Sequence, residues 1–278
     1  MFEVFQYEFM RNALAAGVVA ATLCGIIGVY VILNKIVFIS GGIAHTAFGG
    51  IGLGYFLGKD PLIFAVLFSV VAAMGIGIIS NVKSRISQDT AIGVFWAAGM
   101  SLGILFVSLS RGYAPDLFDY LFGNILAVSP DDIKLILGLT MATLVVVFLL
   151  YKELMILSFD SLYGEAIGLP VQSLHLLLLC MVALSVVVLI KIVGIILVIA
   201  LLTIPSAIGR QYAKTVPRIM FLSIILGIIF VFIGLMISYY FDVPSGATII
   251  LTAAVAFFAS IILSTNGLST QKLIQEHK

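Results

Sequence analysis

Nine apolar segments free of Asp, Glu, Lys and Arg dominate this sequence, and they constrain its fold more than any other feature. A helix needs about 20 apolar residues to cross a bilayer. The chain is 62% hydrophobic and only 10% charged, whereas soluble domains average about 25% charged. We therefore predict an all-α polytopic membrane protein with about nine (eight to nine) transmembrane helices in a single domain, 1–278. The segments are 12–33, 41–58, 61–80, 91–110, 135–151, 174–190, 192–209, 219–241 and 246–264.

The boundary between the sixth and seventh segments is the least defined. Residues 174–209 are almost continuously apolar, and only Lys191 and Gly194 interrupt them. Two short spans and one long broken helix both fit. We favour a turn, because a straight helix of that length would far exceed a hydrocarbon core of about 30 Å at 1.5 Å per residue.

Basic residues near the span ends predict the orientation, because cytoplasmic loops carry an excess of Lys and Arg. Nine spans with the N-terminus outside place every basic cluster in the cytoplasm, whereas the acidic segment 111–132 falls outside. Its Asp116, Asp119, Asp131 and Asp132 either attract cations or are simply what this charge rule leaves over. The basic residues are Lys35, Lys83, Arg85, Arg210, Lys214, Arg218, Lys272 and Lys278.

The stretch 41–58 reads GGIAHTAFGGIGLGYFLG, and as a helix it has one face almost free of side chains. Small residues at i, i+4 spacing allow transmembrane helices to approach closely. A neighbouring helix or a passing solute would both use such a face. We expect its glycines to serve packing or to line a path; they are Gly42, Gly50, Gly54 and Gly58.

His45 lies on this face and is the only ionisable side chain deep within a predicted span, Cys and Tyr aside. Intramembrane polar groups are costly and suggest function, and a neutral imidazole is a common metal ligand. A hydrogen-bonded structural role is the alternative. The nearby Ser40, Thr46 and Asn34 are weak partners for a metal. We expect His175 and His277 to be interfacial or solvated.

Missing motifs exclude several classes of protein. The sequence has no GxxxxGK[ST] phosphate loop and no HExxH motif, so neither ATP hydrolysis nor metalloprotease chemistry by those routes is supported. A net charge of +1 gives no reason to expect nucleic acid. Cys24 and Cys180 lie in apolar runs without the spacing of a disulfide or metal site. Spans without carboxylates argue against a proton-coupled carrier.

The segment 151–173 is longer than a turn requires. Its SFDSLYGEAIGLP core offers Ser158 or Asp160 as a helix cap, and Gly168 and Pro170 as a stop. We predict a short helix at the membrane surface, either an interfacial connector or a docking helix for a cytoplasmic partner.

Several ordered blocks resemble the membrane subunits of ABC importers for zinc and manganese. They are VILNKIVFISGGIAHTAFGGIGLGY, SQDTAIGVFWAAGMSLGILF, YLFGNILAVSPDD, FDSLYGEAIGLPV, KIVGIILVIALLTIPSAIGRQ and DVPSGATIILTAA. The resemblance extends over nearly the whole length of the chain. The YLFGNILAVSPDD block is most similar to the zinc members.

This resemblance implies a homodimer of multi-pass permeases in the cytoplasmic membrane, a cytoplasmic ABC ATPase and an extracytoplasmic metal-binding protein. It implies that the short helix docks on the ATPase; the matching residues are Asp160, Glu165, Ala166, Gly168 and Leu169. The family's second span commonly reads Asp-x-x-x-His. Here His45 matches the histidine, but Gly41 occupies the aspartate position.

We therefore expect a permease subunit, not an enzyme, that moves zinc by alternating access while its partner ATPase hydrolyses ATP. Zinc is then a substrate and not a permanently bound cofactor. The alternative within this class is manganese or iron. A stand-alone secondary carrier and a non-transporting receptor are the alternatives outside it.

Overall fold

The protein is built from helices, and the computed structural model describes residues 6–81, 87–110 and 123–276, with no strand among them. The all-α prediction is confirmed for these residues. The helices are α1 (Glu8–Leu33), α2 (Val37–Leu57), α3 (Pro61–Asn81), α4 (Gln88–Leu109), the short 3₁₀ helix η2 (Ile125–Ala127), α6 (Pro130–Leu149), α7 (Tyr151–Phe159), α8 (Ser161–Ala166), α9 (Val171–Tyr212), α10 (Val216–Phe241) and α11 (Ser245–Glu276).

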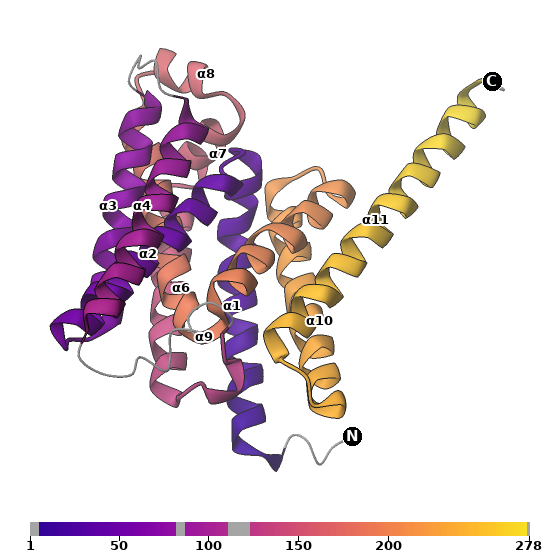
Figure 1. The fold of residues 1–278 in the computed structure, drawn as a ribbon. Helices are drawn as coiled ribbons and strands as arrows, with labels where there is room; N and C mark the ends of the chain where they lie inside the picture. Colours follow the sequence, from indigo (N-terminus) through magenta and orange to yellow (C-terminus); the bar gives the residue numbers. More distant parts are fainter. Residues whose placement is uncertain (1–5, 82–86, 111–122, 277–278) are drawn as a thin grey trace.

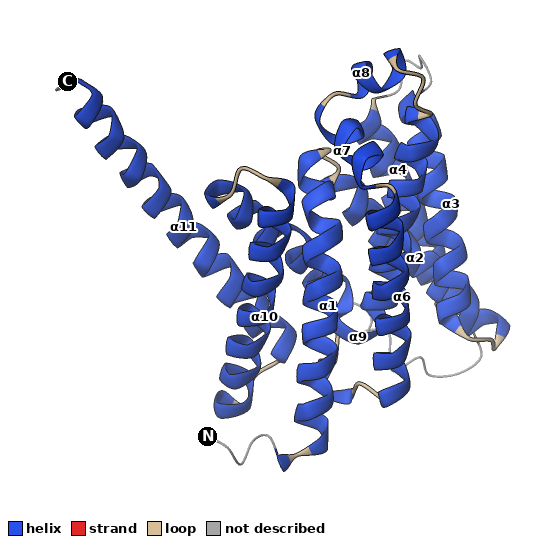
Figure 2. Ribbon diagram, turned by 180° about the vertical axis from the view of Figure 1, so that it is seen from behind, coloured by secondary structure: helices blue, strands red, loops and turns tan. Residues whose placement is uncertain are grey.

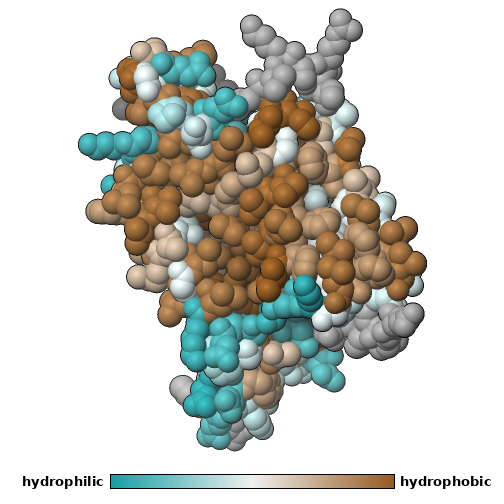
Figure 3. Space-filling view, turned by 90° about the vertical axis from the view of Figure 1, so that its left-hand side faces the viewer, coloured by the Kyte–Doolittle hydropathy of each residue, from teal (hydrophilic) through white to brown (hydrophobic). Residues whose placement is uncertain are grey.

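Eight of the described helices are long and apolar enough to cross a membrane: α1, α2, α3, α4, α6, α9, α10 and the 245–263 part of α11. A band of hydrophobic surface runs across the molecule, with hydrophilic residues above and below it (Figure 3). A belt of this kind is what a bilayer requires of a spanning protein. The chain is therefore a multi-pass membrane protein.

The helices form an inner and an outer set. The inner helices α1, α2 and α9 are mostly buried, whereas the other spans expose much of their surface. Helices α2, α3 and α4 lie together on one side of α1, and α10 and α11 lie on the other (Figures 1 and 2). The segment of α2 that carries His45 therefore lies inside the helix bundle.

Helix α9 changes direction at Gly194. A straight helix of 42 residues would be about 63 Å long, but Gly194 has a φ of 78° and a ψ of 161°, which breaks the helical path. His175 lines a cavity with Leu33 at the C-terminal end of α1. Backbone atoms of Val193 lie against Gly123. Gly123 comes two residues before Ile125, whose Cδ1 lies beside Gly17 in the first half of α1.

After the break, α9 returns toward the C-terminal end of α1, where Ser206 lies beside Gly28 (Figure 1). The two halves of α9 thus occupy the segments predicted as 174–190 and 192–209. The broken helix and the turn, kept as alternatives from sequence, describe the same feature.

The predicted basic clusters that fall on described residues lie at one end of the bundle. Val29 near the end of α1 packs with Val216 and Ile219 of α10 and with residues of α7. Next to this contact in the sequence are Lys35, Lys214 and Arg218. Helix α8 and the end of α11 lie at the same end of the bundle, opposite the start of α1 (Figure 1). The predictions for Lys83, Arg85, Asp116, Asp119, His277 and Lys278 lie outside the described residues.

The predicted short surface helix is present as α8. Asp160 is its N-cap, and its carboxylate accepts a hydrogen bond of 2.9 Å from the amide of Tyr163. Gly168 has a φ of 82°, and its amide donates to the carbonyl of Glu165 as the chain leaves the helix. Asp160 is thus the cap, whereas Ser158 accepts a hydrogen bond from Asn34 Nδ2 at 2.9 Å.

Candidate functional site in helix α2

The glycines of α2 allow two neighbouring helices to approach its backbone. A Cβ added at Gly42 would lie 2.7 Å from Cγ2 of Ile92 in α4, and one at Gly54 would lie 2.5 Å from Cα of Pro61 in α3. A Cβ at Gly50 would overlap the backbone of Phe64. These three glycines therefore make close contacts with other helices.

Gly58 has a different role from the other three. It is the C-cap of α2 with a φ of 62°, and no atom lies within 4 Å of the position that its Cβ would occupy. The left-handed conformation favours glycine because a side chain there is strained. Gly58 therefore ends the helix and leaves the packing to the residues before it.

Helix α4 contributes a complementary pair of glycines. A Cβ at Gly99 would lie 2.5 Å from Cα of Thr46, and one at Gly103 would lie 2.5 Å from Cδ1 of Phe48. The hydroxyl of Thr46 lies 2.8 Å from the carbonyl oxygen of Gly42 and 3.0 Å from that of Phe95 in α4. Packing and this polar contact together fix the register of α4 against α2.

His45 is half-buried at this interface and stacks on Trp96 of α4. The two ring centroids are 4.1 Å apart and the ring planes differ by 10°. The Nδ1 atom is buried and has no hydrogen-bond partner among the described residues. An unpartnered buried polar atom is costly. The stack with Trp96 therefore orients the ring, and the hydrogen-bonding capacity of Nδ1 stays unused.

Gly41 precedes His45 by one helical turn and has room for a Cβ. A Cβ there would lie 3.8 Å from Cδ1 of Ile199 in α9 and 4.0 Å from Cζ3 of Trp96, which are ordinary van der Waals distances. The first carbon of a larger side chain therefore fits. The carboxylate implied by the family pattern is missing from the sequence, although there is room for the start of its side chain.

No group of three or more His, Cys, Asp or Glu that could hold a metal ion occurs among the described residues. The weak partners considered from sequence are also engaged elsewhere. Ser40 Oγ donates to the carbonyl of Val37 at 2.7 Å, and Asn34 Nδ2 donates to the carbonyl of Tyr30 at 2.9 Å. Among the residues that the structure describes, His45 is therefore a single donor without a closed coordination site.

A polar cavity of about 480 Å³ lies at the end of the bundle where α1 ends, between α1, α7, α8 and the start of α9. Glu165 and His175 both line it, together with Gln172 and Asn34. Hence His175, expected at an interface, lies beside the predicted docking helix. The sequence did not reveal this shared cavity, because it depends on how α8 lies against α9 in space.

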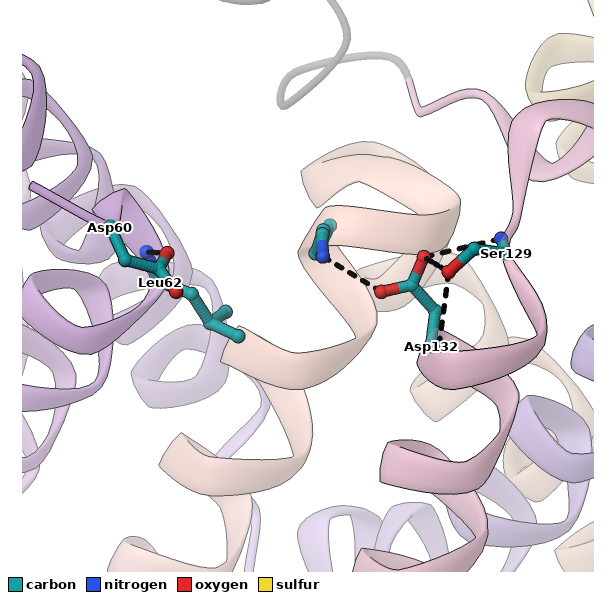
Figure 4. A network of polar contacts seen from close by, with 5 residues as sticks. Asp60, Leu62, Ser129 and Asp132 are labelled. Carbon is teal, nitrogen blue, oxygen red and sulfur yellow. Dashed lines mark hydrogen bonds and ion pairs between the residues drawn. The ribbon is translucent and has the colours of Figure 1, made fainter.

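Charged residues at the break in α9 form a network that the sequence did not reveal. Lys191 Nζ lies 2.7 Å from Oδ1 of Asp132, whose side chain is only 15% exposed. Asp132 and Ser129 also cap α6 reciprocally, with the Ser129 hydroxyl 2.7 Å from Oδ2 (Figure 4). Asp131 pairs with Lys134 at 2.8 Å. Both described aspartates of the predicted acidic segment thus already have a lysine partner.

A membrane-embedded helical bundle with a half-buried histidine in α2 and a capped surface helix at one end is the architecture expected of a permease. The chain belongs to the ABC 3 transport family, whose model matches residues 6–264. The predicted resemblance to metal ABC importers is therefore confirmed at the level of the family.

The relatives agree over nearly the whole chain. The manganese transport system membrane protein MntC of Halalkalibacterium halodurans is 34% identical over 94% of this chain and 89% of its own length. The manganese import system permease protein ScaB of Streptococcus gordonii is 34% identical over 93% and 92%. The solved structure of PsaBC from Streptococcus pneumoniae in complex with Fab contains a similar chain, with a TM-score of 0.83, 36% identity and 92% of each chain covered. This protein is therefore a membrane permease of the metal ABC transporter type.

Proposed function

We propose that this permease moves manganese across the cytoplasmic membrane by alternating access. The observation that carries this proposal is its similarity to two manganese permeases, each 34% identical over more than nine-tenths of the chain. The zinc expectation had rested on one sequence block. No relative described above is named for zinc, so manganese replaces it as the main proposal.

The donor atoms within one chain do not select the metal. Imidazole suits zinc, iron and nickel, whereas manganese prefers oxygen ligands, and His45 supplies one imidazole without a neighbouring carboxylate. A weak site suits a conduit, because conduction requires an ion to leave as readily as it binds. In a homodimer, a second copy of this chain would complete the site by adding its own donor to the single imidazole of His45.

We further propose two partners at opposite ends of the bundle. A cytoplasmic ATPase binds α8, with Asp160, Glu165, Ala166, Gly168 and Leu169 at the contact, and supplies the energy. An extracytoplasmic binding protein delivers the ion near the start of α6. In support of this arrangement, α8 projects from the end of the bundle next to the basic residues, the end expected in the cytoplasm (Figure 2).

Reconstitution tests this function. Permease, ATPase and binding protein from the same genome are placed in vesicles, and uptake of radioactive manganese and zinc is measured with and without ATP. We expect ATP-dependent manganese uptake. Zinc uptake without manganese uptake would return the metal to the original expectation, and proton-driven uptake by the permease alone would indicate a secondary carrier.

A further inference from the structure

Trp96 is the only tryptophan in the chain, and its side chain lies on the imidazole of His45. The rings are nearly parallel, at 10°, with centroids 4.1 Å apart. Trp96 as a residue remains 38% exposed, so part of its surface is free of contacts. The stack joins two helices, because His45 belongs to α2 and Trp96 to α4.

Contacts on both sides of the stack hold the two helices in register. Thr46, which follows His45, makes a hydrogen bond to the carbonyl of Phe95, which precedes Trp96, at 3.0 Å. Gly99 lies one turn after Phe95 and approaches the backbone of Thr46 so closely that a Cβ would lie 2.5 Å from its Cα. The position of the indole over His45 is therefore determined by backbone contacts on adjacent residues.

A stacked indole orients an imidazole differently from a hydrogen bond. Histidines that bind metals usually donate their second ring N–H to a carboxylate or carbonyl, which fixes the ring. The lone pair that binds a metal lies in the plane of the ring. Contact with the face therefore fixes the plane of His45 and leaves both nitrogens for other partners, which agrees with the unpartnered Nδ1.

The indole also extends toward the position of the missing carboxylate. Its Cζ3 atom would lie 4.0 Å from a Cβ at Gly41, on the same helical face as His45. The π face of an indole attracts positive charge, and an imidazole becomes more positive when it binds a cation. Trp96 thus provides an uncharged surface where the family pattern has an acid.

We propose that Trp96 is a positioning residue for the transport path. It holds the His45 ring so that the in-plane lone pair of a ring nitrogen can bind the passing divalent cation. This inference rests on the proposed function, because it takes His45 as a point on that path. Trp96 acts through His45 and does not bind the ion itself.

The single tryptophan allows a direct optical test. The full-length permease is placed in lipid nanodiscs, and the emission of Trp96 is recorded while Zn²⁺ or Mn²⁺ is added to the wild type and to His45→Ala. Zn²⁺ has a closed shell, so a change that it causes reports a rearrangement of the stack, whereas the variant corrects for collisional quenching by Mn²⁺. We expect a saturable change in the wild type that is absent in His45→Ala. Identical titration curves would overturn the proposal.

Transport by variants separates positioning from packing. In vesicles with the ATPase and binding protein, we expect Trp96→Ala to lower ion uptake by about 10-fold, the lower end for groups that orient a metal ligand. Trp96→Phe should recover most uptake, because a phenyl ring preserves the stack. Val94→Ala, a matched control for an exposed residue of α4, should transport normally.

Uptake by Trp96→Ala at the wild-type level would contradict the proposal, and so would equal losses in the Ala and Phe variants. If the wild type itself transports no divalent metal, the proposed function fails. The fluorescence titration is independent of that result, because it needs no ATPase and measures only whether Trp96 responds to a cation through His45.

Discussion

His45 combines three properties that are seldom found together inside a membrane helix: it is ionisable, it is half-buried, and its Nδ1 has no hydrogen-bond partner in the described part of the chain. Its neighbours on the same face are glycines that bring other helices close. The sequence predicted the face and the histidine, because both follow from i, i+4 spacing within one helix. It could not predict the stack with Trp96, since that contact depends on the register between α2 and α4.

We expect His45→Ala to lower ion flux by at least about 10-fold, by comparison with groups that only support a metal ligand, and to leave assembly with the ATPase intact. The physical reason is that alanine removes the imidazole of His45, the side chain of α2 that we propose binds the passing ion. Uptake by reconstituted vesicles measures the flux, and co-purification measures assembly. His277→Ala is the matched histidine control; unchanged flux in His45→Ala would assign this residue to a structural role.

At the scale of the element, glycines decide where helices meet and where they break. The apolar runs placed the spans well because hydropathy is a property of each segment by itself. The break at Gly194 was signalled by Lys191 and Gly194, but the partner of Lys191 was not, because Asp132 lies 59 residues away in the chain. Gly123 was not singled out at all, although it lies against the backbone of Val193.

Gly194→Ala should destabilise the protein by about 1–3 kcal/mol, because a φ of 78° with a ψ of 161° is a conformation essentially restricted to glycine. Thermal unfolding in detergent measures this loss. Gly138→Ala is the control: Gly138 is exposed in α6 with no atom within 4 Å of a Cβ, so alanine there should be neutral or stabilising by up to about 1 kcal/mol. Equal unfolding midpoints for the two variants would contradict the assigned role of Gly194.

Gly99→Ala should also destabilise the protein, because its Cβ would lie 2.5 Å from Cα of Thr46, a backbone atom that cannot rotate away. Overpacking of this kind costs about 1–3 kcal/mol. The same unfolding measurement, again with Gly138→Ala beside it, tests the contact between α2 and α4. A midpoint at or above that of the wild type would show that the two helices separate without cost.

At the scale of the whole molecule, the two ends of the bundle differ. One end carries α8, the polar cavity and the basic residues, and the other carries the capped start of α6 and the break in α9. The sequence predicted α8 together with its cap and its stop, because these signals are local. The sequence could not predict that Glu165 and His175 line one cavity, since that cavity is formed by four helices, α1, α7, α8 and α9.

Replacement of Gly168 by Leu should abolish ATPase binding without unfolding the spans. Gly168 has a φ of 82°, which strains any larger residue, yet no atom lies within 4 Å of a Cβ there, so the damage should remain local to the end of α8. Co-purification with the ATPase measures binding, and the thermal midpoint of the permease measures integrity. A variant that still binds the ATPase would argue against α8 as the docking helix.

The central claim is that this permease carries manganese when its ATPase is supplied with ATP. The most direct measurement is competitive uptake in vesicles that contain permease, ATPase and binding protein, with radioactive manganese and an equal concentration of unlabelled zinc, and then with the labels exchanged. The account predicts ATP-dependent accumulation of manganese that is lost in His45→Ala. Accumulation of zinc alone, or of manganese without ATP, would contradict it.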